Sequence, residues 1–385
     1  MSPDNSKSEL GPLPAHFKKE NVRVICCDID GTTIRKDHTV SKRTINAFHY
    51  LRKNHPDVQI MFATGRPASA AGNIAPLLKD ETDGKDSAPK GKGNAVIGVY
   101  LNGSLVLEHA DGTVKSATTG IDLTNGQPVE YDPSLADKVT GGDTSFKGPW
   151  YAYIDTTRLH ILHERRLLPK DAIWYLNYAE TYNLTIIAYC GNEIVTPNRY
   201  DAVFEHTFAA GEPRAIYDKD LKGKVERGEL VPHKFALVSM DFARMDDVER
   251  SLGVEEGDVV EAGRDGKHNF IPHASLGPRP RDTTKLLRLG KDRLEVMHVD
   301  ASKAAALQTL CKSNKLGTGK VSMSHVMAFG DGFNDIEMVQ EAGMGVAMAN
   351  GEEPLRKIAD FVSATNDEDG VARVLEKVFD IEWKD

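Results

Sequence analysis

Short apolar runs that stop abruptly at a polar residue are the feature that most constrains the fold of this chain. The run VRVICC (22–27) ends at Asp28, QIMFAT (59–64) ends in Thr64, and a helical pattern over 41–53 separates them. Such runs are typical of strands buried on both faces, and strand–helix–strand alternation favours parallel pairing. The sequence therefore predicts an α/β domain whose polar residues gather at the carboxyl ends of its strands.

This alternation is interrupted in the middle of the chain and resumes near its end. Hairpin-like segments replace it from about 110 to 295, which predicts a separate, inserted α+β domain. The alternation returns with LEVMHVD (294–300), a helix over 302–312 and the strand VMAFGDG (326–332). We therefore predict a flexible tail at 1–21, a core built from 22–109 and 296–385, and an inserted domain at 110–295. Gly-, Pro- and charge-rich stretches predict surface loops at 79–93, 116–150 and 262–285.

Composition excludes several classes of function. The 385 residues are 40% hydrophobic and 27% charged, which is ordinary for a globular protein of two domains. A formal net charge of -9 opposes binding to a nucleic-acid backbone, although a local basic pocket can still hold a small anion. Four cysteines without a CxxC spacing favour a reducing, cytoplasmic location over a disulfide scaffold or a zinc site. No membrane span is expected, since no stretch approaches the ~18 apolar residues required, and no obligate protein partner is evident.

Asp28 and Asp30 form the first candidate site, where the first apolar run stops in DIDGT. Two close carboxylates suit a hard cation such as Mg²⁺, and one of them can act as a nucleophile that forms an aspartyl phosphate. A calcium-binding loop also strings acidic residues before a glycine, but aligning Gly31 with that glycine puts Cys26 at the first ligand position. Taken alone, DIDG is equally consistent with a solvated turn.

Three further segments supply partners for this pair. Thr64 ends an apolar run in ATGRP, where Gly65 lets an anion approach the backbone closely. Lys303 begins a helix, so its ammonium and the positive helix end both attract phosphate, although a lone lysine is more often a solvated surface residue. Asp331 and Asp335 lie on a strand-to-helix turn, where one carboxylate can bind metal and the other can steady it. Such a turn can also be a simple helix N-cap.

These segments resemble the motifs of a known family. The chain is similar to the haloacid dehalogenase superfamily in DIDGT (28–32), ATGRP (63–67), SKAAAL (302–307) and GDGFND (330–335), in that order. It resembles the Cof-type phosphatases of that superfamily in YLNGSLV (100–106) and in the C-terminal segments 345–362 and 366–378. The resemblance implies a Rossmann-like parallel-sheet core with an inserted α+β cap of the C2 type (type IIB). One departure is Ala304, which stands where the family commonly has glycine.

The resemblance also implies a role for each site residue. Asp28 would be the nucleophile and Asp30 the general acid and base, for which we expect Asp30 to have the higher pKa of the two. The implied metal is Mg²⁺, held by Asp28, Asp30 through its backbone carbonyl, Asp331 and Asp335. The residues expected to bind the substrate and its phosphoryl group are Thr64, Gly65, Arg66, Asn102, Lys303 and Asn334.

The sequence thus predicts a Mg²⁺-dependent phosphatase of small phosphorylated metabolites, with a phosphosugar as the first choice and flavin mononucleotide or pyridoxal phosphate next. One alternative is a phosphomutase that uses the same phosphoaspartate. Another is a non-catalytic protein that binds phosphometabolites, although binding alone requires neither a nucleophile nor an acid. The charged segments HERR (163–166) and RDGK (264–267) are expected to be solvated.

Overall fold

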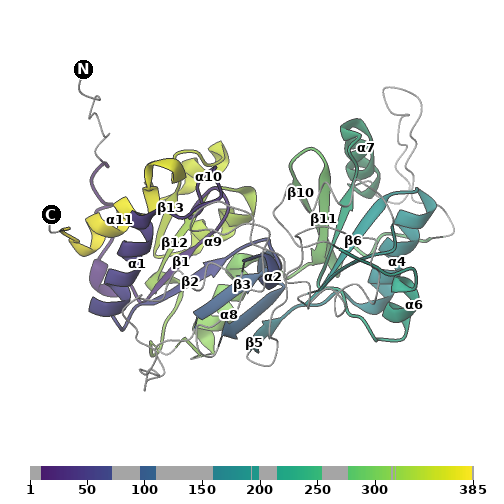
Figure 1. The fold of residues 1–385 in the computed structure, drawn as a ribbon, viewed down its shortest axis with the longest axis horizontal. Helices are drawn as coiled ribbons and strands as arrows, with labels where there is room; N and C mark the ends of the chain where they lie inside the picture. The colour runs from purple at the N-terminus through teal and green to yellow at the C-terminus, as the bar shows by residue number, and fades with distance from the viewer. Residues whose placement is uncertain are drawn as a thin grey trace, which may run out of the picture.

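The computed structural model describes residues 10–71, 96–109, 159–191, 193–198, 215–253, 276–313, 315–316 and 318–383. In these residues the chain forms two β-sheets, one of eight strands and one of six, which lie beside each other along the long axis (Figure 1). The loops predicted at 79–93 and 116–150, the segment RDGK and most of the 262–285 stretch lie outside the described residues.

The larger sheet has the strand order β14–β13–β12–β1–β2–β3–β4–β5. Its strands are β1 (Val24–Cys27), β2 (Gln59–Ala63), β3 (Val96–Tyr100), β4 (Leu105–His109), β5 (Leu159–Glu164), β12 (Val326–Gly330), β13 (Met344–Ala347) and β14 (Phe361–Val362). The strands from β14 to β3 pair in parallel, and β4 and β5 continue the sheet with antiparallel pairing. Every residue of β1 and β12 is buried, as their apolar runs predicted, and the α/β fold is confirmed.

Helices cover both faces of this sheet. They are α1 (Lys42–Asn54), α2 (Ala68–Ala71), α8 (Lys303–Lys312), α9 (Ile336–Glu341), α10 (Glu353–Ile358) and α11 (Gly370–Phe379). Cys27 packs in the cluster that includes α1 and α11, whereas Cys26 packs with α8 and α9, so successive residues of β1 serve opposite faces. Ser41 caps α1 as predicted, because its Oγ accepts the backbone N–H of Thr44 at 3.0 Å.

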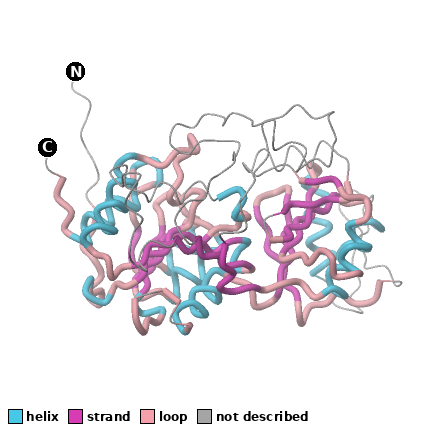
Figure 2. The backbone as a smooth tube through the Cα atoms, turned by 60° about the horizontal axis from the view of Figure 1, so that its bottom comes forward, coloured by secondary structure: helices cyan, strands magenta, loops and turns pink. Residues whose placement is uncertain are grey.

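The smaller sheet has the strand order β10–β11–β9–β6–β7–β8 and is antiparallel except between β7 and β8. Its elements are β6 (Thr185–Cys190), β7 (Glu193–Thr196), β8 (Ile216–Tyr217), β9 (Lys234–Val238), β10 (Thr284–Leu289), β11 (Arg293–His298), α4 (Pro169–Thr181), α6 (Leu221–Glu226) and α7 (Phe242–Gly253). The three helices pack on one face of it (Figures 1 and 2). Apolar residues of the other face, such as Tyr189 and Ala236, belong to the same buried cluster as the larger sheet.

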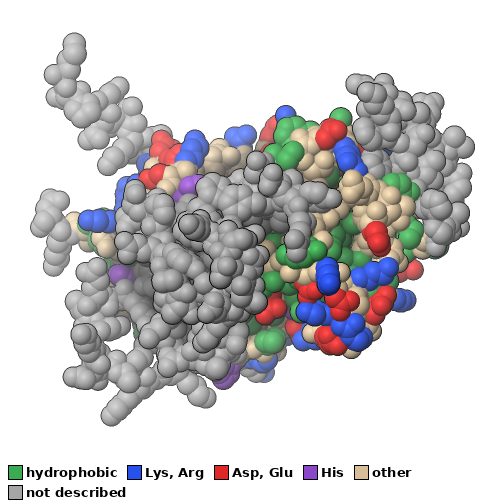
Figure 3. Space-filling view, turned by 45° about the vertical axis from the view of Figure 1, so that its right-hand side comes forward, with side chains coloured by type: hydrophobic (Ala, Val, Ile, Leu, Met, Phe, Trp, Pro, Cys, Tyr) green, Lys and Arg blue, Asp and Glu red, His purple; other side chains and the backbone are tan. Residues whose placement is uncertain are grey.

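β5 lies within the 110–295 range predicted for the inserted domain, yet it pairs with β4 of the larger sheet. The domain boundaries stay a prediction, because residues 110–158 lie outside the described part. We call the smaller sheet with α4, α6 and α7 the smaller domain. Acidic and basic side chains are intermixed on its described surface (Figure 3), and ion pairs such as Lys224–Asp218 form in this domain. Among the described helices, none has the length and apolarity needed to cross a membrane.

Candidate active site

Three aspartates meet where two central strands of the larger sheet end. Asp28 follows β1, and Asp331 and Asp335 follow β12, the parallel neighbour of β1. The Asp28 backbone N–H donates to the Phe329 carbonyl at 2.9 Å, which keeps the two strand ends in register. One carboxylate oxygen of each aspartate lies within 4.8 Å of the others. The structure therefore brings together two motifs that stand far apart in the sequence.

Lys303 is a buried cation between two of these carboxylates. Its Nζ lies 2.6 Å from Asp28 Oδ1 and 2.7 Å from Asp335 Oδ1, and its side chain is 0% exposed. It is the first residue of α8, which Ser302 caps through the Ala305 N–H at 3.1 Å. Burial by itself lowers a lysine pKa, but the two carboxylates outweigh it and raise the pKa of Lys303, so the ammonium stays charged.

Negative charge exceeds positive charge in this cluster. Burial and the nearby Asp335 raise the pKa of Asp28 well above its ordinary value. The same two causes raise the pKa of Asp331 to about 6, although Thr32 Oγ1 donates to its Oδ1 at 3.1 Å. Carboxylates held this close resist ionisation until a cation shares them, and carboxylate oxygens are the ligands of hard divalent cations. The donor set therefore fits Mg²⁺.

Asp335 also fixes the loop that carries Asp331. Its Oδ2 accepts the backbone N–H groups of Asp331 and Gly332, each at 3.0 Å, and the residue is 0% exposed. On the other side, Gly31 has a φ of +72°, and a Cβ there would collide with Asp331 Oδ2. Glycine is thus required at this position for two reasons, the left-handed backbone and the close approach of a carboxylate.

Asp30 forms an ion pair with Arg66, whereas Asp28 and Asp335 contact Lys303. Arg66 donates from Nε to Oδ2 at 2.7 Å and from Nη2 to Oδ1 at 2.5 Å. Burial opposes ionisation, but Arg66 outweighs it and lowers the pKa of Asp30. We expected Asp30 to have a higher pKa than Asp28, and that prediction is wrong for this structure. The order is reversed because Asp28 is buried among carboxylates, whereas an arginine compensates the charge of Asp30.

Thr64 and Gly65 follow β2 beside this pair. Thr64 is 1% exposed, and its Oγ1 accepts the backbone N–H of Arg66 at 3.1 Å. Since a hydroxyl has one proton and this bond uses its oxygen as acceptor, the proton is left to donate to another group. A phosphoryl oxygen is a suitable acceptor for it.

Asn102 and Asn334 are joined by a hydrogen bond from Asn334 Nδ2 to Asn102 Oδ1 of 2.9 Å. Asn102 lies in a 3₁₀ turn, η3 (Leu101–Gly103), where three successive residues have φ values of +53°, +53° and +90°. Leucine and asparagine are strained in this region, so the surrounding contacts must hold the turn. Asn102 is 2% exposed and its backbone N–H donates to the Thr64 carbonyl at 3.0 Å.

Two charged residues of the smaller sheet reach this site, and sequence reasoning missed both. Lys234 Nζ lies 2.6 Å from Glu295 Oε1, and each side chain is 1% exposed. Glu295 Oε2 accepts from Asn102 Nδ2 at 2.8 Å, and Lys234 donates to the Gly65 carbonyl at 2.9 Å. The sequence does contain a signal for both residues, because Lys234 and Glu295 are charged residues in the apolar patterns KFALV and LEVMH. Charged residues in buried strands are rarely left unpaired.

Part of the HERR segment also departs from expectation. Glu164 accepts a hydrogen bond from His233 Nε2 at 2.8 Å and pairs with Arg166 Nε at 2.6 Å, so it is not simply solvated. The bond from His233 ties the end of β5 to the residue before β9.

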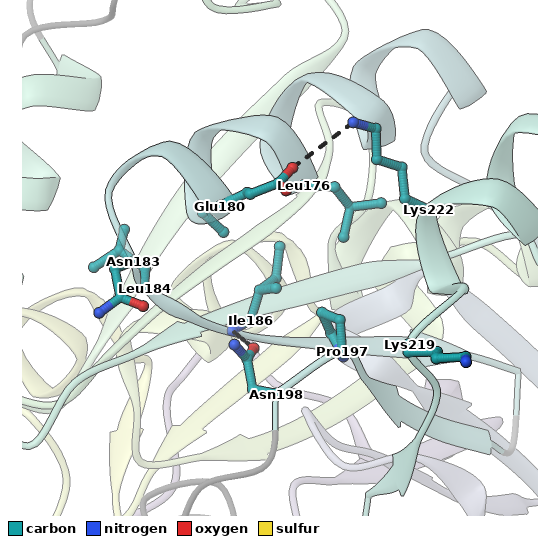
Figure 4. Close-up of a pocket in the computed structure, with 10 residues that line it drawn as sticks. Leu176, Glu180, Asn183, Leu184, Ile186, Pro197, Asn198, Lys219 and Lys222 are labelled. Carbon is teal, nitrogen blue, oxygen red and sulfur yellow. Dashed lines mark hydrogen bonds and ion pairs between the residues drawn. The ribbon is translucent and has the colours of Figure 1, made fainter.

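A pocket of about 390 Å³ lies elsewhere, on the helix-covered side of the smaller sheet (Figure 4). Leu176 and Ile186 line it, and its carboxylate, Glu180, forms an ion pair with Lys222 at 3.8 Å. The pocket contains none of the aspartates described above. The candidate active site is therefore the aspartate cluster and not this pocket.

Comparisons with known proteins agree with the geometry. The family model for haloacid dehalogenase-like hydrolases matches residues 25–121 and 152–375. An uncharacterized hydrolase of Schizosaccharomyces pombe is 24% identical over 381 residues, which cover 98% of this chain and 96% of that protein. A 5-amino-6-(5-phospho-D-ribitylamino)uracil phosphatase of Bacillus subtilis is 45% identical over 82 residues, but these cover 21% of this chain and only 31% of that protein.

The fold of a sugar phosphatase of haloacid dehalogenase subclass IIB is also similar. The TM-score is 0.59 at 16% identity, with 94% of this chain and 100% of that chain covered. The family match and the shared fold confirm the resemblance that the four motifs indicated. The chain therefore belongs to the haloacid dehalogenase-like hydrolases and is of the Cof type.

Proposed function

We propose that this protein is a Mg²⁺-dependent phosphatase that hydrolyses a small phosphorylated metabolite through an aspartyl phosphate on Asp28. The observation that carries the proposal is the cluster of Asp28, Asp331 and Asp335, in which the buried Asp28 and Asp335 both contact Lys303. The residues proposed as nucleophile, cation and metal ligands thus lie at one edge of the sheet.

The metal would be held by the side chains of Asp28 and Asp331, with Asp335 beside them and the backbone carbonyl of Asp30 as a further ligand. Bound there, Mg²⁺ would neutralise charge on the phosphoryl oxygens. Lys303 would contribute a further positive charge, and Thr64 would donate its hydroxyl proton to a phosphoryl oxygen.

In the first half of the reaction the Asp28 carboxylate attacks phosphorus and the bond from phosphorus to the substrate oxygen breaks. Asp30 gives its proton to that leaving oxygen, and the alcohol departs. In the second half water attacks phosphorus, Asp30 takes the proton of that water, and the bond to Asp28 breaks. Inorganic phosphate leaves and both aspartates return to their starting states.

Phosphosugars are the first substrate class, because the structural neighbour in subclass IIB is named as a sugar phosphatase. The Bacillus relative is named for 5-amino-6-(5-phospho-D-ribitylamino)uracil, so that compound joins flavin mononucleotide and pyridoxal phosphate as the next candidates. The proposal includes a cytoplasmic location and, given the net charge of -9, no nucleic-acid partner.

The test is a panel of these phosphorylated compounds, incubated with the protein and Mg²⁺ and assayed for inorganic phosphate. We expect phosphate release from at least one of them and its reversible loss in EDTA. Formation of an isomeric phosphate ester without phosphate release would establish the mutase instead. Binding of a panel compound without any turnover would favour the non-catalytic alternative.

A further inference from the structure

The hydrogen bonds between the two sheets form one network in which the donor and the acceptor of each bond are fixed. Lysine can only donate and a carboxylate can only accept, so Glu295 must receive from both Lys234 and Asn102. This sets the side-chain amide of Asn102, with Nδ2 toward Glu295 and Oδ1 toward Asn334. The charged pair in the smaller sheet therefore determines how an amide in the larger sheet is turned.

One arm of the network ends at Asn334. Because Asn102 presents its oxygen, Asn334 must donate from Nδ2, at 2.9 Å, and its own amide is oriented in turn. Asn334 directly precedes Asp335, the residue that fixes the Asp331 loop. The orientation set at Glu295 thus extends to the turn that carries the metal-ligand candidates.

The other arm ends at Thr64. Lys234 Nζ donates to the carbonyl of Gly65 at 2.9 Å and so fixes the peptide plane between Gly65 and Arg66. The N–H of that same peptide unit belongs to Arg66 and donates to Thr64 Oγ1 at 3.1 Å. The lysine thereby holds the Thr64 hydroxyl in the state in which its proton is available to a phosphoryl oxygen.

Lys234 and Glu295 lie on the face of the smaller sheet from which they can orient groups of the larger sheet. Lys234 on β9 and Glu295 on β11 lie on the face of the smaller sheet opposite to α4, α6 and α7, since their neighbours Phe235, Leu294 and Val296 pack in the helix-covered cluster. Lys234 also lies over the ring of Tyr189, 4.3 Å from its centroid. Replacing a fully buried ion pair by apolar residues of similar volume often leaves stability unchanged, so stability alone does not account for this pair.

We propose that Lys234 and Glu295 are positioning residues, through which the smaller domain orients Thr64 and Asn334 for the phosphoryl group of the substrate. This inference rests on the proposed phosphatase function. It assigns to the smaller domain a part in aligning the phosphoryl group, in addition to any contact with the rest of the substrate.

The test compares Lys234→Met, Glu295→Leu and the double variant that carries both changes. Each single variant leaves a buried charge without its nearest partner, so its Tm should fall; in Lys234→Met, Glu295 keeps the more distant Arg293 Nη1, 3.9 Å from its Oε1. The double variant removes both charges, so its Tm should recover toward that of the wild type. Its kcat for p-nitrophenyl phosphate with Mg²⁺ should nevertheless stay at least about tenfold below that of the wild type, as when a residue that orients a ligand is lost.

A second measurement is independent of turnover. Hydrogen exchange of segment 96–107, read by mass spectrometry, should be faster in the double variant, because the strained turn at Asn102 loses its bond to Glu295. The matched control replaces the ion pair Lys224–Asp218 of the same domain with Met and Leu, and should change neither kcat nor exchange in 96–107.

If segment 96–107 of the double variant exchanges hydrogen at the wild-type rate, the proposal is overturned, whatever the activity of that variant. Faster exchange with an unchanged kcat also overturns it, because the pair would then support the turn without aligning the reaction. If the wild type hydrolyses nothing in the panel, the phosphatase function fails, and the exchange measurement still decides whether the pair holds the turn.

Discussion

Arg66 donates two hydrogen bonds to Asp30, one to each carboxylate oxygen, at 2.7 and 2.5 Å, and so stabilises the ionised form of that carboxylate. Asp30 must carry a proton to act as a general acid, so this pair opposes the first half of the reaction and favours the second. Release of Asp30 from Arg66 is therefore part of the proposed first step.

Replacement of Arg66 by Gln should raise the pKa of Asp30, because the guanidinium that lowers it is gone. Activity that needs protonated Asp30 falls as pH rises through this pKa, so the falling limb of kcat/KM should move to higher pH. A pH profile with a phosphosugar of the panel measures it, because an alkoxide leaving group needs the proton of Asp30, and Arg43→Gln, at an ion pair with Glu376, is the control. A limb that stays in place would show that Arg66 does not set the state of Asp30.

Mg²⁺ should bind more weakly in acid. The pKa of Asp331 is raised to about 6 without the cation, so below that pH a proton competes for the carboxylate. A saturating Mg²⁺ concentration chosen at neutral pH should raise Tm there and raise it less below pH 6. Asp331→Asn should remove the effect at both pH values, whereas an equal rise at both in the wild type contradicts the prediction.

The variant Gly31→Ala should abolish Mg²⁺ binding and leave the protein folded. Its Cβ would collide with Asp331 Oδ2 and push the carboxylate out of the cluster. Gly191→Ala is a matched control, because Gly191 has a similar φ of +66° but nothing within 4 Å of the added Cβ. Calorimetric titration with Mg²⁺ separates the two. Normal binding by Gly31→Ala would mean that Asp331 is not a ligand.

Lys303→Met should destabilise the fold by about 3–5 kcal/mol at neutral pH, because it leaves buried carboxylates without their cation. The loss should shrink in acid, since the pKa of Asp28 is raised and its neutral form needs no partner. Urea unfolding at pH 7.5 and at a more acidic pH tests this. Lys312→Met, at an exposed position near the end of the same helix, should change little. A pH-independent loss would argue against an electrostatic cause.

Asp28→Asn should reduce phosphate release to the background rate with little change in Tm. The amide cannot attack phosphorus, and its neutral charge suits a position where burial already disfavours the ionised carboxylate. Phosphate release and thermal unfolding measure the two effects. Near-normal turnover by this variant would exclude an aspartyl phosphate at this position.

Much of the larger domain could be predicted because its strands are buried on both faces and therefore appear as continuous apolar runs. The edge of the larger sheet that β4 and β5 form was harder to predict. These two strands pair in antiparallel fashion, and residues 110–158 separate them in the sequence. Asp28, Thr64 and Lys303 could be named because each closes an apolar run or opens a helix, whereas Asn102 and Asn334 were implied by the family resemblance.

The partners of those residues could not be named. Lys234 and Glu295 meet Gly65 and Asn102 across two sheets, and no local pattern in one sequence specifies such a contact. The same limit explains the wrong pKa order, since it depends on Arg66 reaching Asp30. Chemical roles could thus be proposed from the types and positions of the residues. The electrostatic environment that neighbouring side chains create could not be predicted in this way.

The pairing of β1 with β12 has a consequence for biosynthesis. β1 ends at Cys27 and β12 begins at Val326, so the ribosome must release every residue through β12 before this pairing can form. Contacts between such distant segments slow folding, and a nascent chain that lacks β12 also lacks Asp331 and Asp335. If these aspartates act as proposed, hydrolysis therefore requires that β12 and the loop after it have been synthesised, and fragments that stop within the smaller sheet are expected to be inert.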